Sequence, residues 1–258
     1  MKRKPFTIFK AVVKALVLRE VQTRFGSQKL GYLWAIIDPM AMIVVFSFIK
    51  TIISHASMPG IDYPVFLATS FLAYNLFKNI SLRTIEAFIS NKGLFVYKQV
   101  KPFDTLVSRA IVESLIIGVV TIIFICIGLY FGFDMEVKDV NMVILGFLWI
   151  GVFGFGLGLL FAVIGTFYEN FKKIIRLMFL PLFFLSALVY TVESLPPIAR
   201  DIILFNPVVH FIEFIHGSFF PELDTKYVDF TYMAFWTLIP FFLGLWLYIK
   251  SERKIVMS

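Results

Sequence analysis

Six apolar runs, each close to the length of a membrane-spanning helix, constrain this chain more than any other feature. A transmembrane helix needs roughly 20 consecutive apolar residues. Only 16% of the residues are charged, against about a quarter in soluble domains. We therefore predict an all-α membrane protein with six transmembrane helices. The predicted spans are Tyr32–Ser54, Pro64–Ile85, Leu106–Phe131, Asn141–Phe167, Ile174–Val192 and Thr231–Ile249.

Lysine and arginine are distributed unevenly between the predicted loops and their flanks. Twenty of them fall on the side that holds the two termini, and four, Lys50, Lys138, Arg200 and Lys226, fall on the other. Cytoplasmic loops carry such an excess. We therefore predict that both termini are cytoplasmic, and that the net charge of +7 reflects membrane topology rather than binding of nucleic acid.

The sequence divides into an N-terminal element, residues 1–30, and a six-span domain, residues 31–258. In the first element apolar residues recur at helical spacing, while Lys10 and Lys14 occupy other faces, a pattern typical of an amphipathic helix at the membrane surface. Such a helix is either a simple anchor or a lever that also touches a cytoplasmic partner. The apolar residues are Phe9, Val12, Val13, Leu16, Val17 and Val21.

The outer segment of about residues 194–222 is apolar in two short pieces, which Asn206-Pro207 separates. A seventh crossing would bury five ionisable groups and an internal proline. Two short re-entrant helices before the last span fit better. His210 and Glu213 share a face of the second helix, where they either pair with each other or line an exit. A metal shared with His216 has loose spacing, so none is predicted.

No phosphate-binding loop of the GxxxxGK[ST] type occurs, and no H-E-x-x-H or G-x-S-x-G motif occurs either. The chain is therefore predicted not to be an enzyme but a transporter, a channel or a structural subunit. After the second span, "GLFVY" places Leu94, Phe95, Val96 and Tyr97 beside lysines in a cytoplasmic loop. An exposed apolar patch rimmed by charge predicts a docking surface for another protein.

Four stretches in their order along the chain resemble ABC-2 type permeases that export capsular polysaccharide from Gram-negative bacteria. One difference is Asp38, where that family is expected to have Glu before the proline of the first span, so the charge is kept on a shorter side chain. The four stretches are "LREVQTRFGSQKLGYLWAIIDP", "GLFVYKQVKPFDT", "PLFFLSALVY" and "FNPVVHFIEFIHGSFFP".

The resemblance implies a homodimer of permeases in the bacterial inner membrane, joined to two copies of a separate ABC ATPase. ATP and magnesium would then bind the ATPase, and this chain would need no cofactor. The implied cargo is a lipid-linked acidic polysaccharide, passed on to periplasmic and outer-membrane capsule export proteins. The alternatives are a drug-type exporter of small molecules, which would share the fold, and a passive pore, for which few acidic groups are available.

Three groups of site residues follow from these inferences. The substrate pathway is predicted at Lys78 and Arg83, which otherwise snorkel to the interface, at Tyr32 and Trp34, which otherwise belong to an interfacial aromatic belt, and at His210 and Glu213. Contact with the ATPase is predicted at Asn91, Lys92, Gly93, Leu94, Phe95 and Tyr97. A gating corner is predicted at Arg24, Lys29, Asp38 and Pro39.

The gating corner generates a first prediction. A carboxylate inside the membrane needs a partner, and Arg24, Lys29 or Lys78 can reach Asp38, while Pro39 interrupts helical bonding and bends the chain. This corner either transmits movement from the ATPase or is a static ion pair. If it moves, Pro39→Ala should give a permease that assembles and supports ATP hydrolysis but exports nothing. Normal export by Pro39→Ala would contradict the moving corner.

Overall fold

The computed structural model describes residues 5–25, 31–53 and 60–257, which form helices with no strand among them, so the all-α prediction is confirmed. Two of the helices, η1 and η2, are short 3-10 turns. The elements are α1 Pro5–Phe25, α2 Gly31–Ile53, α3 Tyr63–Ile85, α4 Ala87–Ser90, η1 Lys92–Leu94, α5 Pro102–Phe131, α6 Val140–Phe167, α7 Glu169–Phe184, η2 Val192–Ser194, α8 Pro197–Ile203, α9 Pro207–Phe219 and α10 Phe230–Met257.

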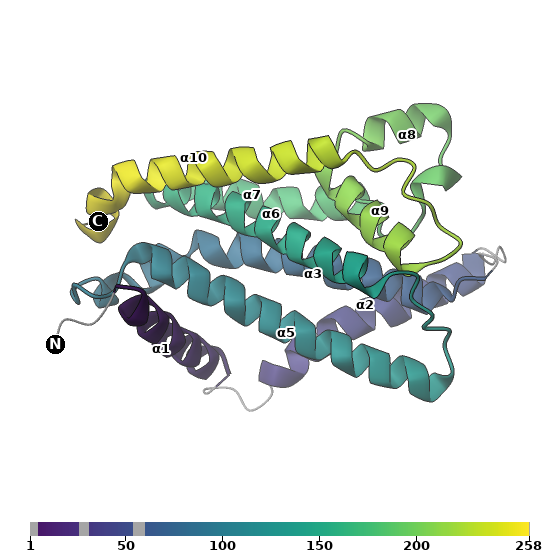
Figure 1. The fold of residues 1–258 in the computed structure, drawn as a ribbon, viewed down its shortest axis with the longest axis horizontal. Helices are drawn as coiled ribbons and strands as arrows, with labels where there is room; N and C mark the ends of the chain where they lie inside the picture. The colour runs from purple at the N-terminus through teal and green to yellow at the C-terminus, as the bar shows by residue number, and fades with distance from the viewer. Residues whose placement is uncertain (1–4, 26–30, 54–59, 258) are drawn as a thin grey trace.

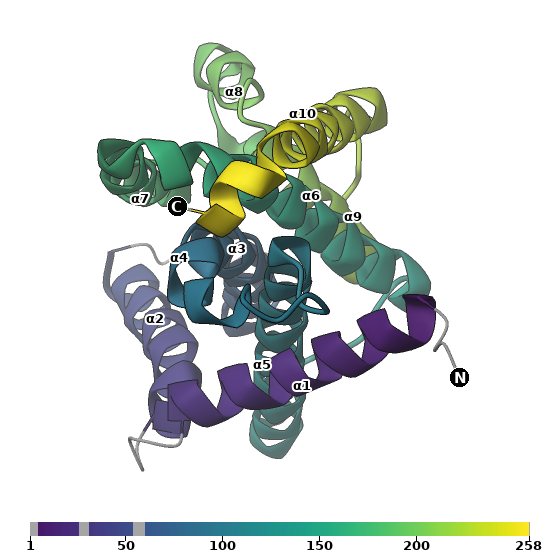
Figure 2. The same cartoon turned by 90° about the vertical axis from the view of Figure 1, so that its left-hand side faces the viewer.

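The long helices run along the long axis of the molecule and leave two different ends (Figure 1). The α1 end carries α1, α4 and the last turns of α10, and the α8 end carries α8 and α9. Figure 2 looks onto the α1 end and shows α1 lying across the bundle rather than along it. Val13 and Leu16 are buried, and α1 packs on α5. The predicted role of α1 at the membrane surface stays a prediction.

The helix α3 is largely enclosed, with α2, α5, α6 and α9 around it. Its hydroxyl groups are all bonded within the protein. Ser81 donates to the Gly154 carbonyl of α6 at 3.1 Å, and Ser70 and Thr84 each donate to the carbonyl one turn back at 2.8 Å. Because protein covers most of α3 and its hydroxyls are already bonded, this helix can carry polar side chains that would be costly if unbonded against acyl chains.

Glycines allow α6 to approach its neighbours closely. A Cβ at Gly154 would lie 3.0 Å from the Phe77 carbonyl oxygen of α3. On the other side of α6, a Cβ at Gly244 of α10 would lie 2.8 Å from the backbone nitrogen of Leu160. The ring of Phe77 stacks on that of Phe153 with centroids 5.0 Å apart. Small residues thus bring α3, α6 and α10 into backbone contact, as is common between membrane helices.

Three helices among the described residues are long and apolar enough to cross a membrane: α5, α6 and α10. The pair α8 and α9 would give a fourth if it counted as one span, but it is bent by 107°. The predicted break at Asn206-Pro207 is confirmed, since the Asn206 side chain accepts from the Val208 N–H at 3.0 Å and Pro207 begins α9. The remaining three spans of the six stay predictions, as does the depth of α8 and α9 in the membrane.

The predicted fifth span, Ile174–Val192, is wrong at its end, because α7 stops at Phe184. Ala187 has a φ of 55°, which turns the chain, and its side chain is buried with Val192 against Ile203 and Val209. The apolar residues after Phe184 therefore fill a small core beneath α8 and α9 instead of continuing the helix.

The last helix is longer than predicted, since α10 continues past Ile249 to Met257. Tyr248 donates to Glu252 at 2.9 Å, and Ile255 is buried in a cluster with Phe88 and Leu106. The charged tail of α10 is thus part of the fold at the α1 end.

The close contact of α6 with α3 predicts a large cost for one added methyl group. A Cβ at Gly158 would lie 2.0 Å from the Thr84 hydroxyl oxygen and 3.2 Å from Ser81 Cα. We expect Gly158→Ala to destabilise the protein by about 1–3 kcal/mol, measured by thermal unfolding in detergent. Gly118→Ala is the control, because nothing lies within 4 Å of its added Cβ. A Gly158→Ala variant as stable as this control would contradict the packing.

Candidate functional site

A network of ion pairs joins α1 to α3 and α5 about three turns from the start of α5. Its centre is Glu113, whose side chain is 3% exposed. Arg24 of α1 donates to the Glu113 carboxylate, and Arg83 Nε of α3 lies 3.7 Å from the same oxygen. One turn earlier on α5, Arg109 lies 3.4 Å from Glu20 of α1 and donates to the Arg83 carbonyl at 2.6 Å. Both ion pairs of α1 are therefore made with α5, and Arg83 of α3 joins the network through the Glu113 carboxylate.

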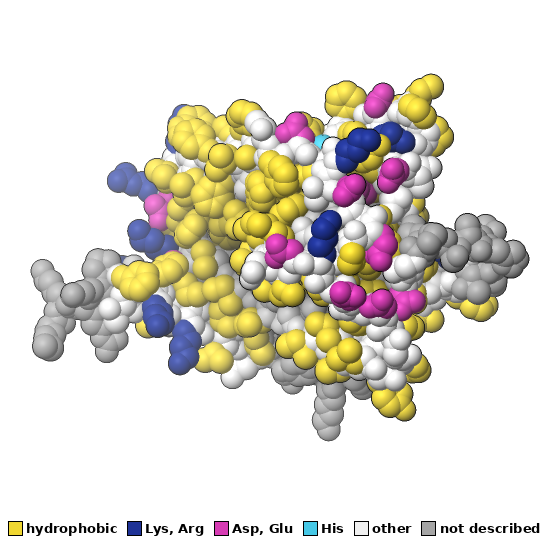
Figure 3. All heavy atoms as spheres, turned by 45° about the vertical axis from the view of Figure 1, so that its right-hand side comes forward, with side chains coloured by type: hydrophobic (Ala, Val, Ile, Leu, Met, Phe, Trp, Pro, Cys, Tyr) yellow, Lys and Arg dark blue, Asp and Glu magenta, His cyan; other side chains and the backbone are white. Residues whose placement is uncertain are grey.

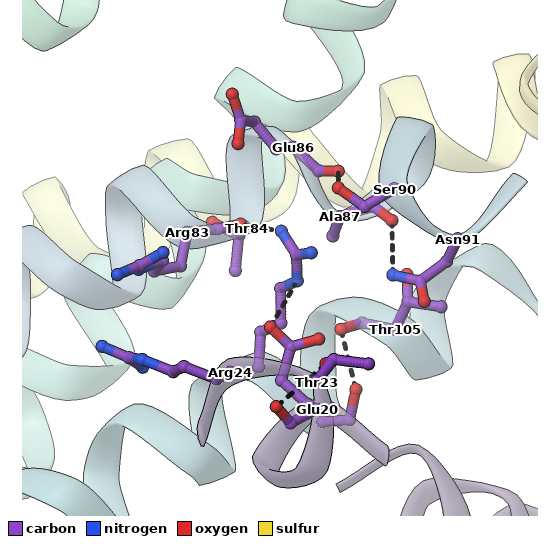
Figure 4. A network of polar contacts seen from close by, with 12 residues as sticks. Glu20, Thr23, Arg24, Arg83, Thr84, Glu86, Ala87, Ser90, Asn91 and Thr105 are labelled. Carbon is purple, nitrogen blue, oxygen red and sulfur yellow. Dashed lines mark hydrogen bonds and ion pairs between the residues drawn. The ribbon is translucent and has the colours of Figure 1, made fainter. Parts of the chain in front are cut away.

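A second link joins α1 to the turn between α4 and η1. Arg19 donates to the Asn91 side-chain oxygen at 2.9 Å, and the Asn91 amide donates to the Ala87 carbonyl at 2.8 Å. Asn91 is 6% exposed, so this link is largely shielded from solvent. Figure 4 shows Glu20 and Arg24 of α1 grouped with Arg83 and Asn91 at this place. We call the whole set, with Arg19, Arg109 and Glu113, the α1 network.

The α1 network has a clear electrostatic requirement. A carboxylate that is almost fully buried, as Glu113 is, costs several kcal/mol unless cations and hydrogen-bond donors surround it. Arg24 and Arg83 place two cations beside one oxygen of Glu113, while its second oxygen has no hydrogen-bond partner among the described residues. Arg109 supplies the cation beside Glu20. The pairs can hold only while α1 stays against α5, so the charges fix the position of α1.

The predicted docking residues divide into an exposed and a buried set. Tyr97 and Val96 are 65% and 83% exposed, and Ile89 of α4, which the sequence analysis missed, is 54% exposed. Lys92 and Gly93 are also exposed, and Leu94 is half-buried. We call Ile89, Val96 and Tyr97 the loop patch.

The prediction that Phe95 is exposed in this loop is wrong, while the contact of Asn91 with the ATPase stays a prediction. The 3-10 turn η1 directs Phe95 back against Ala87, Phe88 and Leu106, where it is 7% exposed. Asn91 lies on the same inner side, bonded to Arg19. These two residues support the loop from beneath, and the loop patch is its outer surface.

The structure places only part of the predicted gating corner. Arg24 bonds to Glu113. Pro39 is buried within α2, and the helix continues through it. Lys29 lies outside the described residues, and so does the side chain of Asp38, whose predicted ion pair stays a prediction.

The predicted pathway residues lie in different parts of the fold. Arg83 belongs to the α1 network, whereas Lys78 is half-buried on α3. The side chains of Tyr32 and Trp34 lie outside what the structure describes. At the α8 end, His210 and Glu213 are both buried.

The hydrogen bonds of His210 and Glu213 do not join these two residues to each other. His210 bonds to the Leu204 carbonyl at 2.9 Å and accepts from the Asp229 N–H at 3.1 Å. Glu213 accepts from the Val192 N–H at 3.1 Å. Within the part of the chain that the structure describes, both side chains therefore brace α9 against the surrounding loops.

The sequence analysis missed Glu113 as a site residue, although a signal was present. Glu113 stands inside an apolar run, and Arg109 precedes it by one helical turn. A buried carboxylate in such a run implies cations from other helices. The cations cannot be assigned from sequence alone, since Arg24 lies 89 residues away along the chain.

The α1 network predicts unequal costs for two matched substitutions. Glu113→Gln removes the charge that Arg24 and Arg83 share, and we expect a loss of roughly 2–3 kcal/mol in stability and faster proteolytic cleavage of α1. Glu86→Gln breaks the pair with Arg176, in which both side chains are 50% exposed, and should cost less than about 1 kcal/mol. Thermal unfolding and limited proteolysis measure both. Equal effects would show that Glu113 does not hold α1.

Comparisons with known proteins agree on the family of this chain. The model of the ABC-2 type transporter family matches residues 11–220. The chain is 35% identical over 258 residues to the polysialic acid transport protein KpsM of Escherichia coli, covering 100% of both chains. It is 25% identical to the capsule polysaccharide export inner-membrane protein BexB of Haemophilus influenzae (94% of this chain, 91% of BexB) and 25% identical to CtrC, of the same description, from Neisseria meningitidis serogroup B (96% and 94%). This chain belongs to the ABC-2 type transporter family.

Proposed function

We propose that this chain is the permease subunit of an ATP-driven ABC exporter that moves lipid-linked capsular polysaccharide across the bacterial inner membrane. The observation that carries the proposal is the 35% identity to KpsM over the full length of both chains, together with the similarity to BexB and CtrC. A drug-type exporter would share the family, but the names of these three relatives all concern transport or export of polysaccharide. A passive pore does not account for membership of an ABC family.

ATP hydrolysis in this proposal belongs to a separate subunit, which also holds the nucleotide and its magnesium. The assembly comprises two permeases and two ATPase subunits, and delivers the polymer to periplasmic and outer-membrane capsule export proteins. The acidic charge of the polymer and its lipid end are parts of the proposal that rest on the family resemblance. The six-span topology and the predicted pathway residues Tyr32, Trp34, Lys78, His210 and Glu213 belong to it as well.

The orientation in the proposal places the α1 end in the cytoplasm with both termini. Its support is the separation of charge between the two ends. Figure 3, which brings the α8 end forward, shows Asp and Glu gathered there with some Lys and Arg among them, while other Lys and Arg reach out near the α1 end. Cytoplasmic surfaces of membrane proteins carry the excess of Lys and Arg. The acidic residues in α8, in η2 and between α9 and α10 are Glu193, Asp201, Glu222, Asp224 and Asp229.

Movement would pass from the ATPase through the loop patch to the α1 network. The loop patch is exposed, and directly beneath it Asn91 bonds to Arg19 of α1. From α1, Arg24 reaches Glu113 of α5, and Arg83 of α3 lies beside the same carboxylate. A push on the loop is thereby shared by α1, α3 and α5. The gating-corner hypothesis named Arg24 as one candidate partner of Asp38. In the coupling proposed here, Arg24 pairs with Glu113 instead.

The direct test of function is export by living cells. The gene is deleted, the cell surface is stained for capsule, and the wild-type gene is returned on a plasmid. We expect loss of surface polysaccharide with polymer trapped inside, and recovery on complementation. Capsule that stays intact after deletion would overturn the proposed function.

Docking of the ATPase generates a separate prediction. Tyrosine is enriched among interface residues that carry binding energy, so we expect Tyr97→Ala to lower co-purification of the ATPase roughly tenfold, the effect of ~1.4 kcal/mol of binding energy. The matched control is Tyr130→Ala, because Tyr130 is 85% exposed and lies on the last turn of α5, away from the loop patch. Quantitative pull-down from membranes with equal permease levels measures both. The same loss in both variants would contradict docking at the loop patch.

A further inference from the structure

A long groove of about 990 Å³ lies between α5 and α6, with α3 as its floor. The helix α5 packs mainly on α1 and α3, while α6 packs mainly on α3 and α10, so a hollow is left between them. On α5 the lining runs from Val107 to Ile125, a rise of about 27 Å at 1.5 Å per residue. The groove is therefore close in depth to the hydrocarbon core of a bilayer, which is roughly 30 Å thick.

The lining of the groove has almost no polar group to offer a ligand. Its three hydroxyl side chains, Thr69, Ser114 and Thr121, each donate to a carbonyl of their own helix at 2.8 to 2.9 Å. The rest of the lining is aliphatic, aromatic or glycine. A glycan would lose its hydrogen bonds to water here without replacing them. Hydrocarbon chains have no hydrogen bonds to water to lose, so the lining suits acyl chains.

Exposed lysines lie in the loop that leads into α5, on the side of the groove that is nearest the α1 end. Phe155 lines this end, and the ring of Phe103 lies edge-on to it with centroids 6.0 Å apart. Lys101, two residues before Phe103, is exposed, and so is Lys98 in the same loop. Lys101 does not line the groove but precedes the lining residue Val107 by six residues, about 9 Å along the helix axis. Lysines in the loop that leads to an apolar groove match a ligand with an anionic head and hydrocarbon tails.

We propose that the groove between α5 and α6 binds a membrane phospholipid, with its acyl chains along the groove and its anionic headgroup at Lys98 and Lys101. The groove itself is separate from the α1 network and from the loop patch, although Lys98 directly follows Tyr97 of the loop patch. The site depends on the chain being in a membrane and not on which substrate the chain exports. The lipid fills the space between two helices that contact each other little, and so stabilises their separation.

The test uses the full-length protein in nanodiscs made from equal parts of phosphatidylglycerol and phosphatidylcholine. The protein is transferred to mild detergent, and the lipid that stays bound is quantified by mass spectrometry. Gly118 lines the groove and nothing lies within 4 Å of a Cβ added to it, so Gly118→Phe directs a ring into the groove. We expect this variant to retain roughly tenfold less lipid.

The matched control is Val119→Phe, since Val119 is the next residue on α5, is 53% exposed and does not line the groove. This control should retain as much lipid as the wild type. Equal retention by Gly118→Phe and wild type would overturn the site. A Gly118→Phe variant that turns dimers into monomers would also overturn it, because the groove would then be a contact between two copies of this chain.

The headgroup is tested by the ratio of the two retained lipids. Wild type should retain more phosphatidylglycerol than phosphatidylcholine, and Lys98→Gln and Lys101→Gln should each lower that ratio roughly fivefold. The total amount of lipid retained by these variants should be close to the amount retained by wild type, because the groove itself is intact. Equal retention of the two lipids by the wild type would overturn the headgroup assignment.

Discussion

The arrangement of the bundle depends on one constraint, which is that α3 carries more polar groups than a helix facing lipid can carry. Its serine and threonine hydroxyls need partners inside the protein, and each finds a carbonyl within 3.1 Å or less. Enclosure by α2, α5, α6 and α9 meets this need. The enclosure in turn requires close approach, which the glycines of α6 permit. The apolar helices α5, α6 and α10 are then left facing outward.

The α1 network lies where α3 ends, and it brings charged groups together in the same way. Arg83, in the last turn of α3, lies with its charge beside the Glu113 carboxylate of α5. The Arg83 side chain is half-exposed whereas Glu113 is buried, and Arg24 of α1 supplies the second cation beside this carboxylate. The helix α1 is thereby tied through α5 to α3. A displacement of α1 would expose or separate these charges, so the proposed coupling has a physical cost.

Those parts of the fold that follow from local chemistry could be predicted from the sequence. The break between α8 and α9 is one of them, since the Asn206 side chain caps α9 and Pro207 begins it. The bounds of α2, α3, α5 and α6 lie within a few residues of the predicted spans, because apolarity and helix coincide there. The end of α7 was not predictable in this way. The run after Phe184 is as apolar as a span, and only the packing of Ala187 and Val192 beneath α8 separates the two cases.

The candidate site was predicted less well, because its parts are joined over long distances in the chain. The exposure of Tyr97 and the burial of Phe95 are set by the turn η1, although the two residues have similar apolar character in sequence. Glu113 is a carboxylate in an apolar run, a signal that the sequence analysis did not use, and its partners come from α1 and α3. Such a position indicates that a charge needs a partner, but it leaves the partner open.

The chemistry of the α5–α6 groove bears on where a polymer of sugars would pass. A glycan needs hydrogen-bond partners or charges along its path, and the hydroxyls of this groove are already bonded to their own helices. The groove is therefore suited to lipid and not to the polymer. The polymer has no path along α3 either, because the residues on the buried face of α3 are packed against other side chains. A polymer-sized path formed between two copies of the chain avoids both obstacles, and this is the physical argument for the proposed homodimer. The dimer contact should then involve a surface other than the groove, which the Gly118→Phe variant can distinguish.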